Sequence, residues 1–161
     1  MKKNFLNFQT SFDEASSIFI PLPYHIQNKK YEISQSIIDI LAKSSELSGL
    51  DSELNQNIKH LDIHTNTSYS EEHSTFTVES LFEQISNLTQ RSIERQKWIL
   101  SLGGDRALTV PIIRGIVDGM SDSFGILNLD AHLNLIESSS HLDQQTMRDL
   151  LSLTPYIFSF G

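Results

Sequence analysis

Trp98-Ile99-Leu100-Ser101-Leu102-Gly103-Gly104 is the stretch that decides the fold of this chain. A short apolar run that ends in two glycines is typical of a strand followed by a tight turn. A helix is predicted over residues 109–119, with Pro111 in its first turn, and residues 124–129 repeat the apolar strand pattern. The order of strand, glycine turn, helix and strand predicts a β-α-β unit with parallel strands.

The same patterns continue towards the amino terminus. Residues 17–23 read Ser-Ile-Phe-Ile-Pro-Leu-Pro, an apolar run closed by prolines, which predicts a buried strand that leaves the sheet into a loop. Apolar residues recur at helical spacing over residues 31–43 and again over 78–93. The second of these predicted helices has Thr75 or Thr77 available as its N-cap.

A short helix around residues 146–151 and a strand at 156–160 complete the expected elements, whereas the polar stretch 48–77 is expected to form loops around a short strand or helical turn. Strands that alternate with helices imply right-handed crossovers and a parallel sheet with helices on both faces. The predicted fold class is therefore α/β, a three-layer α/β/α arrangement with a mainly parallel sheet. With 161 residues, the chain is expected to form one domain or a piece of one.

Composition excludes several classes of function. The chain has 12 Lys and Arg against 20 Asp and Glu, a formal net charge of -8, which repels nucleic acid and anionic membrane surfaces. The absence of cysteine excludes disulfides, thiolate metal sites and a cysteine nucleophile. Neither a secretory signal nor a membrane span is indicated by the apolar runs. We expect a soluble, cytoplasmic protein.

Ligands of parallel α/β sheets bind outside the carboxyl ends of the strands, so the polar residues that follow each strand are the candidate site. Asp130 and His132 come directly after the strand predicted at 124–129. One carboxylate and one imidazole there are plausible ligands for a divalent metal ion. The alternative interpretation is that both are hydrogen-bonded polar residues at the end of a strand.

Two segments that follow successive predicted strands read Gly103-Gly104-Asp105-Arg106-Ala107 and Asp130-Ala131-His132-Leu133-Asn134. The first resembles Gly-Gly-Asp-His-Ser and the second resembles Asp-Ala-His-x-Asp, which are signatures of the ureohydrolase family of arginase, agmatinase and formimidoylglutamase. Residues 18–24 resemble the family's opening strand and turn. The resemblance covers nearly the whole chain and about the first half of the family's domain, so residues 1–161 are expected to form a single partial domain with an incomplete, arginase-like sheet that lacks the C-terminal half.

The resemblance implies a manganese-dependent reaction. In the family, two manganese ions held by histidines and aspartates activate a hydroxide, which attacks a guanidinium or amidine carbon and releases urea or a related amide. Carried over residue by residue, Asp130 and His132 are retained, Asn134 replaces an aspartate, and Arg106 stands at a ligand histidine. Because a guanidinium has no lone pair to offer, Arg106 is not expected to bind metal. The remaining family aspartates follow a later strand, which lies beyond Gly161.

Two further residues have alternative interpretations. Arg106 either occupies the place of one manganese ion and pairs with Asp130, or points to solvent from the glycine turn. Ser140-His141 resembles the family's Ser-His segment, whose histidine aids proton transfer near the leaving amine, so His141 is either catalytic or a surface histidine. Residues 146–148, Thr-Met-Arg, resemble the start of a helix in agmatinases.

Two functions are compatible with these residues. The first is a ureohydrolase-like protein of the agmatinase or arginase type, which acts on a small guanidino compound if active and in which hydrolysis is impaired or lost. The substrate stays open between agmatine, arginine, formimidoylglutamate and other compounds. The second is a non-catalytic interaction module or truncated pseudoenzyme. Its incomplete sheet would leave the apolar strand at 156–160 uncovered, which favours self-association or a mixed oligomer with a family paralogue.

Overall fold

The computed structural model describes most of the chain and divides it into two compact units. The described residues are 5–27, 30–33, 35–46, 50–51, 56–57, 62–66, 77–129, 142–153 and 156–160. The first unit comprises residues 1–24, 33–75 and 95–104, and the second comprises residues 25–32, 76–94 and 105–161.

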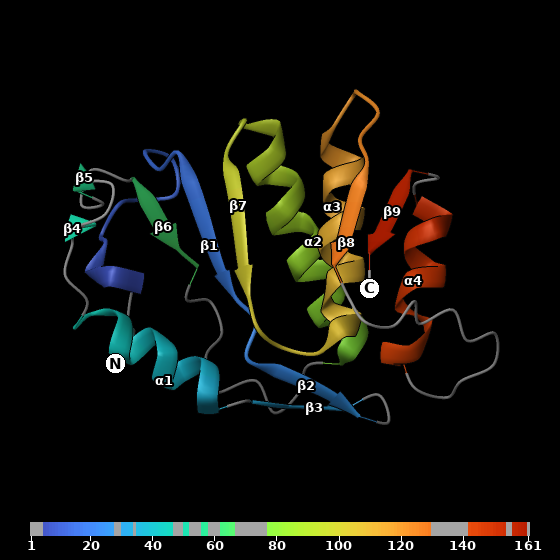
Figure 1. The fold of residues 1–161 in the computed structure, drawn as a ribbon, viewed down its shortest axis with the longest axis horizontal. Helices are drawn as coiled ribbons and strands as arrows, with labels where there is room; N and C mark the ends of the chain where they lie inside the picture. The colour runs from blue at the N-terminus through green and yellow to red at the C-terminus, as the bar shows by residue number, and fades with distance from the viewer. Residues whose placement is uncertain are drawn as a thin grey trace. The chain divides into compact units, whose positions relative to one another are not determined.

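A parallel three-stranded sheet forms the centre of the first unit. Strand β1 (Ser17–Pro21) lies between β6 (Ile63–Thr65) and β7 (Trp98–Leu102) and pairs in parallel with both, as Figure 1 shows. Ile18 and Ile20 of β1 are each 0% exposed, and Phe19, which points to the opposite face, is 2% exposed. The predicted strand over residues 17–23 is confirmed, and its prolines end it at Pro21.

One face of this sheet is covered by η1 (Phe5–Asn7) and α1 (Gln35–Ser44). The core cluster consists of Phe19, Leu41 and Ile63, with Phe5, Phe8 and Leu102 packed against it. The ring of Phe5 stacks on that of Phe19 at 4.4 Å between centroids. The helix predicted from residue 31 begins at Gln35, because residues 30–33 extend into β3 (Lys30–Ile33), which pairs with β2 (Tyr24–Gln27).

Two closely packed helices, α2 (Val78–Glu94) and α3 (Thr109–Gly119), belong to the second unit. Their close approach depends on Gly115, where an added Cβ would lie 2.3 Å from the carbonyl oxygen of Ser86. At the start of α2, the backbone N–H of Ser80 donates to Thr77 Oγ1 at 3.2 Å. Thr77, one of the two predicted alternatives, is therefore the N-cap of α2. Its side-chain oxygen accepts a hydrogen bond from an N–H that has no partner within the helix.

The second unit also contains a parallel pair of strands, β8 (Ile126–Leu129) and β9 (Ile157–Phe160). Ile126 pairs with Ile157, and both pack on a core cluster from α3 and α4 (Leu142–Leu153) that includes Val110, Ile113 and Leu150. The opposite face of the pair is open: Leu127 is 63%, Leu129 75%, Tyr156 55% and Phe158 63% exposed. We call these four residues the outer face of β8–β9.

The remaining short strands are β4 (Leu50–Asp51) and β5 (Gln56–Asn57), which form an antiparallel pair. Strands β4, β5 and β6 are the described secondary structure within residues 48–77. Loops around one short strand or a helical turn were expected there. Within the described ranges, β7 pairs only with β1 and β8 only with β9. The predicted α/β class with parallel strands is confirmed. No described helix combines the length and the apolar character that crossing a membrane requires.

Candidate functional site

A left-handed glycine turn follows the carboxyl end of β7. Gly103 has φ +78° and Gly104 φ +86°, a backbone region that side chains with a Cβ rarely adopt. A Cβ added at Gly103 would also lie 2.0 Å from Cδ1 of Ile37 on α1. Both the backbone conformation and the lack of space therefore require glycine at position 103.

Asp105 directly follows this turn, and its carboxylate binds the backbone of the second unit. Oδ2 accepts a hydrogen bond from the N–H of Ile26 at 3.1 Å, and Oδ1 accepts one from the N–H of Ala107 at 3.1 Å. The side chain is only 6% exposed, and Nδ1 of the more exposed His25 lies 3.7 Å from Oδ2. Asp105 thus caps the short helix η3 (Arg106–Leu108) and ties it to β2.

Asp105 belongs to the first predicted motif, but no role was predicted for it from the sequence. The available signal was an aspartate at the start of a helical turn, a position where its carboxylate accepts backbone N–H bonds. The bond to Ile26 had no local signal, because it joins residues 79 positions apart in the sequence.

Arg106 is the first residue of η3, and its side chain is exposed, whereas the next two residues, Ala107 and Leu108, are buried. An exposed side chain is compatible with both interpretations of Arg106. Its pairing with Asp130 stays a prediction, because Asp130 lies outside the described residues.

The other predicted site residues, Asp130, His132, Asn134 and His141, also lie outside the described residues. Their place in the chain is nevertheless informative, because Asp130 comes immediately after Leu129, the last residue of β8. Within the part of the chain that the structure describes, no group of three His, Asp or Glu residues could hold a metal ion. The chemistry of the candidate ligands therefore has to be judged from residue type.

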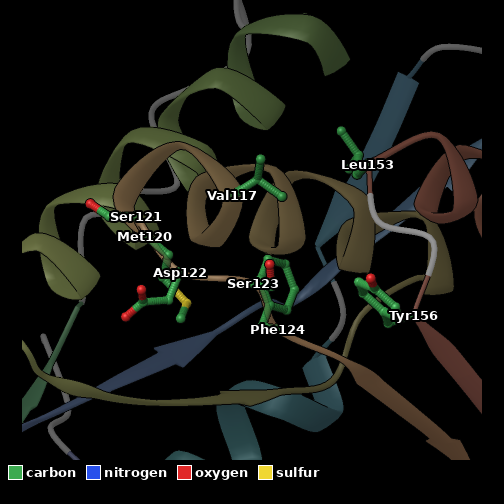
Figure 2. Close-up of a pocket in the computed structure, with 8 residues that line it drawn as sticks. All are labelled: Val117, Met120, Ser121, Asp122, Ser123, Phe124, Leu153 and Tyr156. Carbon is green, nitrogen blue, oxygen red and sulfur yellow. The ribbon is translucent and has the colours of Figure 1, made fainter.

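A small pocket in the second unit is lined by none of the motif residues. It has a volume of about 250 Å³ and is lined by Val117, Met120, Ser121, Asp122, Ser123, Phe124, Leu153 and Tyr156, as Figure 2 shows. The loop 120–124 precedes β8, and Tyr156 precedes β9. The pocket thus lies at the amino ends of these strands, whereas ligands of parallel sheets bind at the carboxyl ends. It is not the predicted site.

Comparison with known proteins supplies the context for these residues. The sequence profile of the Arginase family matches residues 20–150. N(1)-aminopropylagmatine ureohydrolase from Synechocystis sp. (strain ATCC 27184 / PCC 6803 / Kazusa) is 26% identical over 160 residues, which cover 94% of this chain and 52% of that protein. The chain therefore spans about half the length of this curated relative.

Solved structures show the same fold. Formiminoglutamase of Trypanosoma cruzi, crystallised with Mn²⁺, superposes with a TM-score of 0.74 at 18% identity, over 98% of this chain and 57% of that chain. Agmatine ureohydrolase of Thermoplasma volcanium superposes with a TM-score of 0.71 at 17% identity, over 96% of this chain and 51% of that chain. The fold expected from the motifs, an arginase-like α/β fold present in part, is confirmed.

Proposed function

Because this chain belongs to the Arginase family, we propose that it is a ureohydrolase-like protein in which manganese-dependent hydrolysis of a guanidino or amidine C–N bond is impaired or lost. The reaction class is that of the agmatinase and arginase types. The name of the Synechocystis relative suggests an N-substituted agmatine as one small guanidino substrate to test, alongside agmatine, arginine and formimidoylglutamate.

The observation that carries this proposal is the side chain at position 106. The glycine turn leads through Asp105 into η3, and an exposed arginine stands where the resemblance places a ligand histidine. A guanidinium is protonated at all physiological pH values and offers no lone pair, so it cannot coordinate a metal ion. The positive charge would also repel a cation bound nearby.

The residues of this chain do not fit a two-manganese centre. Asp130 and His132 are suitable ligands, and Asn134 offers a neutral amide oxygen, which is a weaker donor than a carboxylate. We propose that these three residues form at most a weak site for one ion. His141 would act as the proton-transfer group only if such a site forms, and otherwise it is a surface histidine.

The direct test is manganese binding by isothermal titration calorimetry, combined with an assay of urea release from agmatine, arginine and N(1)-aminopropylagmatine and of formamide release from formimidoylglutamate. We expect no binding in the micromolar range and no product release at rates typical of enzymes. Rapid manganese-dependent hydrolysis of any of these compounds would disprove the loss of function.

Replacement of Arg106 by histidine tests the cause of the impairment. Arg106→His restores a neutral imidazole at the ligand position, so manganese affinity should rise by about tenfold or more. Arg114→His is the matched control, because Arg114 is an exposed arginine on α3 that belongs to neither motif. An equal gain in both variants, or no gain in either, would show that Arg106 is not what excludes the metal.

A second candidate function is that of a non-catalytic interaction module. The specific observation in its favour is the outer face of β8–β9, where four large apolar side chains are more than half exposed. Self-association and a mixed oligomer with a family paralogue are the two forms such an interaction would take. Size-exclusion chromatography with light scattering distinguishes them, because only self-association raises the mass of the chain alone.

A further inference from the structure

The pocket of about 250 Å³ in the second unit lies where helices α3 and α4 both end. Val117 lines it from the last turn of α3, Met120 is the residue that caps this helix, and Leu153 is the last residue of α4. The N–H of Ile126 donates to the carbonyl oxygen of Tyr156 at 2.7 Å, which joins the start of β8 to the residue before β9. The pocket is therefore formed by the fold itself, which lowers the cost of ordering its walls around a ligand.

Both helices present their C-terminal ends to this pocket. The aligned peptide dipoles give the C-terminus of a helix a partial negative charge, so a cation is favoured there. The last turn of α3 reads Ile-Val-Asp-Gly and that of α4 reads Leu-Leu-Ser-Leu, without a basic side chain that would offset this charge. The helix ends around the pocket thus attract a positively charged ligand.

The side chains of residues 121–123 add to this attraction. Asp122 supplies a carboxylate, and Ser121 and Ser123 supply hydroxyl oxygens. A primary ammonium group has three N–H donors that such oxygens can accept. The described residues that line the pocket include no Lys, Arg or His, and the formal net charge of the chain is -8. An anion would therefore be repelled.

The rest of the lining is apolar and aromatic. Val117, Phe124 and Leu153 are partly buried and pack on the core cluster of the second unit. Figure 2 shows Phe124 between Asp122 on one side and Tyr156 on the other. Aromatic rings also interact favourably with organic cations. The lining therefore suits an organic cation with an apolar body better than a metal ion, which needs several oxygen ligands.

We propose that this pocket binds a small primary alkylammonium ion, with the ammonium group at Asp122 and the alkyl chain along Phe124 and Tyr156. The pocket volume limits the ligand to a short alkyl chain. No residue of the two motifs lines the pocket. The inference is therefore independent of whether the chain binds manganese or hydrolyses a guanidino compound.

The experiment uses n-butylammonium as the probe and compares it with two molecules of similar size, neutral n-butanol and anionic butyrate. Titration of the isotope-labelled full chain, followed by its amide NMR shifts, should give a dissociation constant of about 1–10 mM for n-butylammonium, as expected for so few ligand atoms. The largest shifts should lie on the residues that line the pocket. Butanol should bind about fivefold more weakly or worse, and butyrate should bind more weakly than butanol.

Asp122→Asn removes the carboxylate from an exposed side chain, so the variant should fold and should bind n-butylammonium no better than n-butanol. Asp118→Asn is the matched control, because Asp118 is an exposed aspartate near the end of α3 that does not line the pocket. It should change the affinity by less than about twofold. Tyr156→Ala should weaken n-butylammonium and n-butanol alike, since it removes apolar contact without changing charge. Circular dichroism checks the folding of each variant.

Equal affinity for n-butylammonium and butyrate, or equal losses in Asp122→Asn and Asp118→Asn, would overturn the proposal. So would shifts confined to residues outside the pocket, or no shifts at all over the expected concentration range. Arg106→His alters the first motif and should leave n-butylammonium binding unchanged. Failure of the proposed function and failure of this inference can therefore be distinguished.

Discussion

Strands β1 and β8 have similar apolar sequences but opposite surroundings. Ile18, Phe19 and Ile20 of β1 are buried on both faces of the strand, and β1 has a parallel neighbour on each side. In β8, Ile126 is half-buried while Leu127 and Leu129 are exposed, and β9 is its only described neighbour. An apolar run thus specifies a strand suited to burial, whereas the neighbouring segments decide whether burial occurs.

The largest change in the free energy of unfolding is expected for a substitution in the enclosed strand β1. Ile20→Ala removes buried methyl and methylene groups from a side chain that is 0% exposed, so the free energy of unfolding should fall by about 2–5 kcal/mol. Urea denaturation followed by circular dichroism measures this. A loss below about 1 kcal/mol would mean that β1 is not enclosed as described.

An intermediate change in the free energy of unfolding is expected for a substitution between helices α2 and α3. Gly115→Ala places a methyl group 2.3 Å from the Ser86 carbonyl oxygen, so the free energy of unfolding should fall by about 1–3 kcal/mol although alanine favours helices. At Gly125 the nearest atom to an added Cβ is 3.5 Å away, an ordinary contact. Gly125→Ala is therefore the control, and equal destabilisation of the two variants would contradict the close packing of α2 on α3.

The smallest change in the free energy of unfolding is expected for a substitution on the outer face of β8–β9. Leu129 is 75% exposed, so Leu129→Ala should change the free energy of unfolding of the chain alone by no more than about 0.5 kcal/mol. The same denaturation measurement applies. A loss comparable to that of Ile20→Ala would show that the outer face of β8–β9 is already covered in the isolated chain, and the contrast between the two strands would disappear.

The candidate site was predictable in part. The glycines before Asp105 and the strand before Asp130 were evident in the sequence, because a turn with positive φ favours glycine and a short continuous apolar run indicates a strand. The bond from Asp105 to the N–H of Ile26 was not predictable. It depends on β2, which no local sequence pattern places beside Asp105.

The sequence by itself determined the α/β class, the positions of β1, β7, β8, β9, α2 and α3, and the mismatch of Arg106 with metal ligation, because each depends on residue type and local spacing. Tertiary structure alone decided that β1 is enclosed while one face of β8 is exposed, and that the Asp105 carboxylate accepts a hydrogen bond from the N–H of Ile26. The physical reason is that burial and long-range hydrogen bonds depend on which segments meet in space, and residues distant in the sequence supply those segments.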